Sequence, residues 1–171
     1  MIPSAFLKTV KDSIENISLA QVHQLSELVS GTKGKIIILG NGGSNAIASH
    51  IAEDYTKALK KLSLCFSDAP RLTCYANDYG YENAYRQFLV EFAEKDGLVI
   101  LISSSGNSEN IIRCAKYCIV QEIPFISLSG FSSDNKLKTV SAEKALINFW
   151  VDSTDYGVVE CTHEIFLHSI I

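Results

Sequence analysis

Four side chains in two segments of the sequence have the types and spacing of a metal or proton-transfer site. His50 and Asp54 are four residues apart, and Glu160 and His168 are eight apart, so each pair falls on one face of a helix. Imidazole nitrogens and carboxylate oxygens bind zinc, and the same groups can transfer protons. A histidine plus a carboxylate on each of two helices is a reasonable ligand set for a divalent metal ion, although Glu53, three residues from His50, is a further candidate.

The same side chains also have simpler interpretations. Each histidine taken singly can be a satisfied core or surface residue, and the carboxylates can pair with Lys57 or Lys60. Along the last segment, Glu160, Glu164 and His168 recur every four residues and form one polar stripe. Two ionised carboxylates that face each other without a cation would repel. The metal hypothesis is therefore favoured over a cluster without a cation.

Two loops rich in glycine and serine have the composition of a phosphate site. "GNGGS" (40–44) follows the apolar run "IIIL", and "SSSGNS" (103–108) follows "LVILI". Each loop opens a predicted helix, whose first N–H groups and positive dipole end favour an anion. Alternatively, Ser44 and Ser108 are only helix N-caps and the glycines only form turns. Neither loop matches the Walker A or GxGxxG pattern. We expect a monophosphate to contact Asn41, Gly42, Gly43, Ser44, Ser103, Ser104, Ser105, Asn107 and Ser108.

The elements that must position these residues alternate between strands and helices. Short apolar runs predict strands near 36–39, 62–68, 97–103, 124–130 and 145–153. Helical periodicity predicts helices over 4–30, 44–61, 84–94, 109–122 and 158–171, whereas 69–84 mixes turn residues with aromatic ones. This alternation is typical of a doubly wound α/β fold with a five-stranded parallel sheet. Ligands in such sheets bind beyond the carboxyl ends of the strands.

The overall composition indicates an ordinary globular domain. A length of 171 residues favours one domain, with an N-terminal helix at about 4–30 and an α/β core at about 33–171. The formal net charge of -4 argues against a nucleic-acid-binding protein. We find neither a signal peptide nor an apolar run of membrane-spanning length. The five cysteines, without a CxxC motif, are expected to be reduced thiols of a cytoplasmic protein.

Four motifs together resemble a known family. "GNGGS", "SHIAED", "YANDYG" and "SSSGNS" occur in this order in the SIS (sugar isomerase) domain, and the chain is most similar to its phosphoheptose isomerases. The resemblance implies a homotetramer with active sites at subunit contacts and an N-terminal helix used in assembly. It also implies the isomerisation of sedoheptulose 7-phosphate to glycero-manno-heptose 7-phosphate through an ene-diol. The product would serve the biosynthesis of lipopolysaccharide or capsule heptose.

The resemblance also implies roles for individual residues. His50 and His168 match zinc ligands, and His168 matches a catalytic acid or base. Asp54 stands where the family has a catalytic glutamate, and Glu160 stands where it has a glutamine. Asp78 matches an active-site aspartate, although the residues around it also suit an Asx-turn. The resemblance thus implies that Asp54 and His168 are catalytic and that Asp78 contacts the substrate. With these departures, it also implies that His50, Asp54, Glu160 and His168 converge on one divalent metal ion, with zinc as the first candidate.

The sequence departs from the family pattern in further places. The family has an arginine near Ala58 that helps to hold the sugar phosphate, and Lys57 and Lys60 are the nearest substitutes here. A lysine cannot donate in the bidentate manner of arginine. The family also has an aspartate near Gly157, where Asp155 is the nearest carboxylate.

Other functions remain open from the sequence. Some SIS proteins keep the fold and tetramer but bind protein partners, including a group that binds the bacterial replication initiator. Others sense a sugar phosphate beside a helix-turn-helix, for which 171 residues leave no room. An aminosugar isomerase is a further alternative. We favour an isomerase because Glu160 and His168 can both take part in chemistry.

Overall fold

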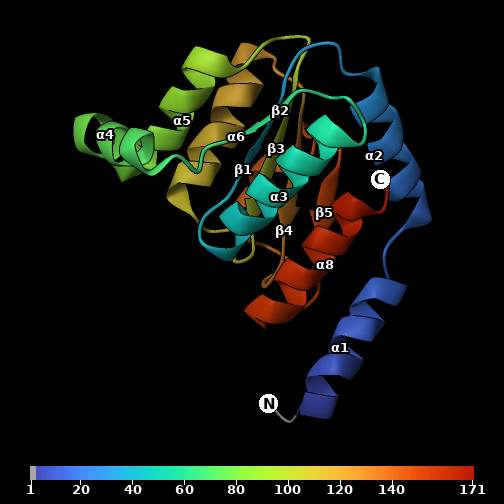
Figure 1. Cartoon of the computed structure of the whole chain (residues 1–171). Coiled ribbons are helices and arrows are strands. Elements are labelled where there is room, and N and C mark those ends of the chain that lie inside the picture. The colour runs from blue at the N-terminus through green and yellow to red at the C-terminus, as the bar shows by residue number, and fades with distance from the viewer. Residues whose placement is uncertain (1–2) are drawn as a thin grey trace.

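The computed structural model describes residues 3–171, which form a parallel sheet covered by helices (Figure 1). The strands are β1 (Ile36–Leu39), β2 (Ser63–Cys65), β3 (Leu98–Ser103), β4 (Phe125–Ser129) and β5 (Asn148–Trp150). The helices are α1 (Pro3–Glu15), α2 (Leu19–Gly31), α3 (Gly43–Lys57), α4 (Ala69–Tyr79), α5 (Tyr81–Phe92), α6 (Glu109–Gln121), α7 (Lys136–Ser141) and α8 (Tyr156–His168).

The strands are all parallel and lie in the order β2-β1-β3-β4-β5. In register, Ile36 of β1 lies between Ser63 of β2 and Leu98 of β3. The chain therefore leaves β1 toward one edge of the sheet and then returns to build the other side from β3. Ligands bind where the strand order reverses in this way. The doubly wound five-stranded sheet is confirmed, and "GNGGS" and "SSSGNS" follow the two strands at the reversal.

The two faces of the sheet bury two separate layers of apolar side chains. Along β1, Ile36 and Ile38 pack with side chains of α2, α3 and α8, whereas Ile37 and Leu39 pack with those of α5 and α6. Successive strand residues point to opposite faces, so a run of apolar residues covers both. Figure 1 shows the helices on both sides of the sheet. No helix within residues 3–171 is long and apolar enough to cross a lipid bilayer.

The helix predicted over 4–30 is two helices, which corrects the sequence prediction. α1 ends at Glu15, and α2 begins after Ser18, whose side chain accepts a hydrogen bond from the Gln21 N–H at 3.4 Å. The apolar period continues across the break, so periodicity alone did not reveal it, but a serine is a favoured N-cap. α1 packs against α8, with Phe6 beside Gly157, and projects away from the rest of the chain (Figure 1).

Residues 69–79 form helix α4, although the sequence there indicated mixed turns. Asp68 caps the helix by accepting from the Arg71 N–H at 2.9 Å, and a proline lies in the first turn, where its missing N–H costs nothing. The helix stops at Gly80, which has φ 77°. Helix α7, with Asn135 as its cap, also lies in a stretch where no element was expected.

Candidate active site

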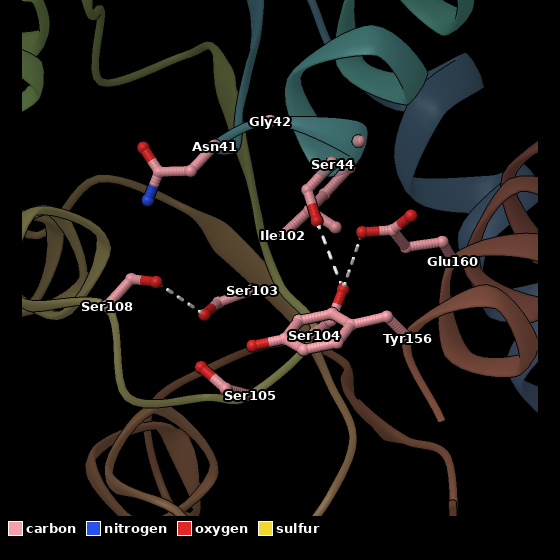
Figure 2. Close-up of a pocket in the computed structure, with 11 residues that line it drawn as sticks. Asn41, Gly42, Ser44, Ile102, Ser103, Ser104, Ser105, Ser108, Tyr156 and Glu160 are labelled. Carbon is pink, nitrogen blue, oxygen red and sulfur yellow. Dashed lines mark hydrogen bonds between the residues drawn. The ribbon is translucent and has the colours of Figure 1, made fainter. Parts of the chain in front are cut away.

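The loops after β1 and β3 enclose a cavity of about 240 Å³ (Figure 2), which we call the serine cavity. It is lined by Asn41, Gly42, Gly43, Ser44, Ile102, Ser103, Ser104, Ser105, Ser108, Tyr156 and Glu160. The Glu160 carboxylate lies directly against Gly43, where a Cβ atom would displace it. The five serines expected to contact the anion, Ser44, Ser103, Ser104, Ser105 and Ser108, all line this cavity.

The serine hydroxyls face one another rather than capping helices. Ser104 Oγ donates to Glu160 Oε1 at 3.4 Å and lies 3.3 Å from Ser44 Oγ, while Ser103 Oγ donates to Ser108 Oγ at 3.2 Å (Figure 2). Ser108 occupies the N-cap position of α6, but its hydroxyl makes no capping bond, and the N-cap of α3 is Gly42. The alternative that Ser44 and Ser108 serve only as caps is therefore not supported.

Two predicted substrate contacts do not line the cavity. Asn107 holds the second loop: its N–H donates to Ser105 Oγ at 3.2 Å, and its side-chain oxygen accepts from the Lys136 N–H at 3.3 Å. Asp78 lies in the last turn of α4, where it accepts from Cys74 Sγ at 3.5 Å and from the Asn77 amide at 2.9 Å. Contact of either side chain with substrate stays a prediction.

The sequence did not single out the residues that fix Asn41. Asn41 and Asn110 exchange two amide hydrogen bonds of 3.0 and 2.8 Å, and Tyr81 donates to Asn41 Oδ1 at 2.8 Å. Asn110 is buried at the start of α6, only two residues after "SSSGNS". Its burial cannot be read from the sequence, but its place two residues after this loop is the signal that could have identified it. Tyr156, at the start of α8, was also missed.

His50, Asp54, Glu164 and His168 meet between α3 and α8, and we call them the histidine cluster. Asp54 Oδ2 lies 3.3 Å from His50 Nε2 and 3.1 Å from His168 Nε2, so it bridges the two imidazoles. Glu164 Oε1 lies 3.1 Å from His50 Nδ1. The two rings pack edge to face with their centroids 4.9 Å apart. Spacing on two helices thus correctly predicted that His50, Asp54 and His168 would meet.

The donor set of this cluster fits a divalent cation. One ligand atom from each of His50, Glu164 and His168 lies within 4.8 Å of the others. In addition, both imidazole Nε2 atoms approach the same carboxylate oxygen of Asp54. Two nitrogen lone pairs and an ionised oxygen repel one another unless a proton or a metal ion lies between them. Nitrogen and oxygen donors of this kind are ligands of zinc.

The structure differs from the predicted metal set at one carboxylate. Glu160 was expected beside the two histidines, but its carboxylate lines the serine cavity, and Glu164, one turn later on α8, approaches His50 instead. Both residues belong to the same four-residue stripe, so spacing alone could not decide between them. The part of Glu160 in a metal shell stays a prediction.

The charged residues considered as substitutes for the family's arginine and aspartate make other contacts. Lys57 pairs with Glu53 at 3.3 Å, and Lys60 donates to the Lys57 carbonyl at 2.7 Å. Asp155 caps α8 by accepting from the Val158 N–H at 3.1 Å. The alternative that lysines neutralise the cluster carboxylates is therefore not what the structure contains. Among the described residues, the lining of the serine cavity includes no lysine or arginine.

One buried histidine lies on the inner face of α8, next to the cluster residue Glu164. His163 Nε2 lies 3.1 Å from the Ser129 carbonyl oxygen, and its Nδ1 has no partner among the described residues. Burial lowers the pKa of His163 from an ordinary 6.5 to about 4. This neutral imidazole therefore holds α8 to the end of β4 and is separate from the cluster.

Comparisons with known proteins agree with the fold and the motifs. A family model described as the SIS domain matches residues 4–130. The chain is 34% identical over 169 residues to a phosphoheptose isomerase of Helicobacter pylori strain P12, covering 95% of this chain and 84% of the relative. It is 33% identical over 146 residues to a phosphoheptose isomerase of Fusobacterium nucleatum, covering 82% and 73%. In structure it resembles phosphoheptose isomerase GmhA from Neisseria gonorrhoeae, with a TM-score of 0.87, 24% identity and coverage of 99% and 94%, a likeness of the fold.

Proposed function

The chain belongs to the SIS domain family and is an isomerase of the phosphoheptose isomerase group, and we propose that it converts sedoheptulose 7-phosphate into glycero-manno-heptose 7-phosphate. One structural observation carries this proposal. Successive turns of α8 present Glu160 to the serine cavity and Glu164 and His168 to the histidine cluster. A phosphate anchor and a set of proton-transferring groups are thereby joined by one rigid helix.

The serine cavity is the proposed phosphate anchor. The hydroxyls of Ser103, Ser105 and Ser108 lie beside the start of α6, where free N–H groups and the helix dipole favour an anion. Because no lysine or arginine lines the cavity within residues 3–171, neutral donors would bind the phosphate. The Glu160 carboxylate would repel an anion, but it lies beside Ser104, on the side away from Ser103, Ser105 and Ser108 (Figure 2). Fixing the phosphate determines which carbon of the sugar reaches the reactive groups. Positioning of this kind can lower the activation barrier by up to roughly 7–11 kcal/mol.

The histidine cluster is the proposed site of proton transfer. Moving a hydrogen between C1 and C2 through an ene-diol needs a base at carbon and an acid at oxygen. Asp54 and His168, whose polar atoms are 3.1 Å apart, are an acid–base pair within direct proton-transfer distance. In this proposal Asp54 or His168 removes the proton from carbon, and the partner supplies or accepts a proton at the adjacent oxygen.

The contacts of Asp54 with both imidazoles support binding of zinc by His50, Asp54 and His168. Glu160, whose carboxylate lines the serine cavity in this structure, would have to turn toward them to be the fourth ligand. When bound, a divalent cation supplies Lewis-acid stabilisation of negative charge on the sugar oxygens. Protein purified without chelator should contain zinc, and the His168→Ala variant should contain much less. Equally low zinc in both proteins would leave the metal without support.

A homotetramer is part of the proposal, because the proposed reactive groups are open in one chain. The side chain of His50 is 54% exposed, and α1 presents an exposed Leu7 while contacting the body of its own chain through α8. A neighbouring copy could cover both features. Light scattering should give four times 18.8 kDa, whereas a monomer would count against sites shared between subunits.

We also propose that the whole chain, residues 1–171, is one SIS domain that acts in the cytoplasm. All five cysteines are free, and Cys114 and Cys118 are buried thiols whose pKa burial raises. A reducing compartment preserves such thiols. The expected product is an intermediate in the biosynthesis of lipopolysaccharide or capsule heptose.

The decisive experiment supplies the purified protein with sedoheptulose 7-phosphate, with and without added zinc, and follows the sugar signals by NMR. We expect the aldose phosphate to appear, and the Asp54→Asn variant to form it far more slowly. Substrate binding without turnover in the zinc-supplied wild type would instead support the alternative of a non-catalytic SIS protein that binds phosphosugars or a protein partner.

A further inference from the structure

Glu164 contacts both histidines of the cluster, and it does so with two different chemical groups. Its side-chain Oε1 lies 3.1 Å from His50 Nδ1. Its main-chain carbonyl oxygen lies 3.1 Å from His168 Nδ1. In each imidazole, Nδ1 therefore contacts Glu164 and Nε2 contacts Asp54. One residue thus holds the Nδ1 atoms of both rings.

The chemistry of these partners fixes where each ring carries its hydrogen when its Nε2 atom binds a cation. A main-chain carbonyl oxygen and an ionised carboxylate can only accept, so His168 Nδ1 can donate to the Glu164 carbonyl and His50 Nδ1 to Glu164 Oε1. Asp54 Oδ2 also only accepts, so without a cation Asp54 and Glu164 compete for the hydrogen of each neutral ring. With hydrogen on both Nδ1 atoms, the two Nε2 lone pairs point to the side of Asp54.

We propose that Glu164 is a positioning residue that sets both imidazoles in the tautomer with hydrogen on Nδ1 and so directs two Nε2 lone pairs toward one point beside Asp54. The proposal rests on the proposed function, because those lone pairs matter only if they bind a cation or receive a proton. Carboxylates and carbonyls that hold the far nitrogen of a histidine fix its orientation and strengthen its binding of metal.

A purely structural role explains the arrangement less well. The side chains of Glu164 and His50 are 39% and 54% exposed, and exposed ion pairs contribute little to stability, roughly 0–1 kcal/mol. Direct ligation by the Glu164 carboxylate is the other alternative. Glu164 Oε1, however, contacts His50 Nδ1, whereas the other ring nitrogen, His50 Nε2, faces Asp54. We therefore assign Glu164 to orientation, and direct ligation becomes an outcome of the test.

The first readout is the tautomer of each histidine in the metal-free protein, observed in long-range ¹H–¹⁵N correlation spectra. In the wild type, acceptors face both nitrogens of each ring, and the spectra give the reference population of hydrogen on Nδ1 for His50 and His168. In Glu164→Gln the amide can donate as well as accept, so His50 should populate the other tautomer. His168 should not change, because its partner is the main chain. An unchanged His50, or a His168 that changes equally, would overturn the proposal.

The second readout is the affinity for Co²⁺, a coloured substitute for zinc, in the full-length protein. Glu164→Gln and Glu164→Asp should each weaken binding about 10- to 100-fold. The matched control is Glu53→Gln, which removes a carboxylate paired with Lys57 on the same helix as His50. It should bind within about twofold of the wild type. Circular dichroism would establish that each variant is folded.

The shape of the cobalt absorption band separates orientation from direct ligation. If Glu164 orients His50, the band keeps its shape in Glu164→Gln while the dissociation constant rises. A band of altered shape would make Glu164 a ligand and overturn the assignment, as would affinities equal to that of Glu53→Gln. If the wild type bound no cobalt, the metal proposal would fail, and the His50 tautomer would still decide the role of Glu164. Isomerase activity is measured separately, so its absence would count against the substrate alone.

Discussion

The serine cavity and the histidine cluster lie at opposite ends of one polar stripe on α8, yet they are constructed differently. In the cavity, Ser44, Ser103 and Ser104 are 3–5% exposed; Ser103 ends β3, Ser104 follows it, and Ser44 lies in the first turn of α3. In the cluster, His50 is 54% exposed, and apart from the Glu164 carbonyl that contacts His168, the groups meet through side chains of α3 and α8. The anchor is thus held by the backbone of the sheet, whereas the reactive groups are held by their mutual contacts.

This difference suggests how the two regions should fail. Changes of the backbone should damage the cavity, because its shape follows from the turns after β1 and β3. Changes of single charged atoms should damage the cluster, because its geometry depends mainly on contacts between charged side chains. Four predictions test this division, from the largest expected effect to the smallest.

The largest effect is expected for Asp54→Asn, which keeps the shape of the side chain but removes the bridging charge. Asp54 Oδ2 contacts both imidazoles, and loss of an acid–base group lowers turnover by roughly 10²- to 10⁴-fold. The kcat for sedoheptulose 7-phosphate should fall by this amount with little change in KM. Glu53→Gln is the control that should retain activity. A tenfold rise in KM at unchanged kcat would assign Asp54 to binding instead.

The stability of the fold around α8, the helix that carries Glu164 and His168, should depend on pH through His163. Its pKa falls from 6.5 when exposed to about 4 in the fold, so the unfolded chain takes up this proton first. The stabilisation is complete above about pH 6.5 and is lost as pH falls to about 4, a loss of roughly 3 kcal/mol in the free energy of unfolding. Urea titrations measure how far the free energy of unfolding falls between pH 7 and pH 4. This fall should be smaller by roughly 3 kcal/mol in His163→Gln than in the wild type. An identical difference in both proteins would contradict the assignment.

The cavity should be sensitive at Gly106, in the turn of the second serine loop. Its φ is 66°, and an added Cβ would collide with Asn135. The Asn135 amide is buried and donates to the carbonyls of Gly130 and Ser132, so it cannot yield. Gly106→Ala should lower the free energy of unfolding by roughly 2 kcal/mol, measured by urea titration.

The control for this change is Gly31→Ala at the end of α2, where a Cβ would meet nothing within 4 Å. Alanine should be neutral or slightly stabilising at that position. If Gly106→Ala were as stable as Gly31→Ala, the loop would not be held by its backbone, and the contrast between the two regions would lose its basis.

The smallest effect is expected for a single hydroxyl of the cavity. Ser108→Ala removes a donor from the proposed phosphate anchor but leaves the main-chain N–H groups in place. A hydrogen bond to a charged group is worth about 1.5–3 kcal/mol, and the remaining main-chain donors keep the loss at the lower end of this range. KM should therefore rise about 10-fold while kcat stays within about twofold. Ser30→Ala on the exposed side of α2 is the control. A loss confined to kcat would mean that the cavity takes part in the reaction itself.

Much of the fold followed from local patterns. Buried runs such as "IIIL" and "LVILI" identified β1 and β3, and their order with the helices gave the parallel sheet. The break at Ser18 was missed because apolar residues keep the helical period on both sides of it. Helix α4 was missed because Pro70 and Asp68, which suggested turns, serve as its first-turn residue and its cap.

The sequence predicted which residues belong to the site better than it predicted how they are arranged. Spacing placed His50 with Asp54 on one face and His168 on another, and the structure joins them. Spacing could not choose between Glu160 and Glu164, because both lie on the same stripe of α8. That choice depends on how α8 is rotated against α3, which long-range packing decides. Asp78 lies on α4, and no local pattern indicates which partner it would face.

The four-residue spacing on α8 also limits how this protein can change during evolution. Removing one residue between Glu160 and Glu164 would rotate the rest of the helix by about 100°, turning Glu164 and His168 away from α3. Insertions and deletions should therefore be rare in this helix among functional descendants, while the loops at the amino ends of the strands accept them. New substrate preferences in this lineage would have to arise by substitution within a helix of fixed length.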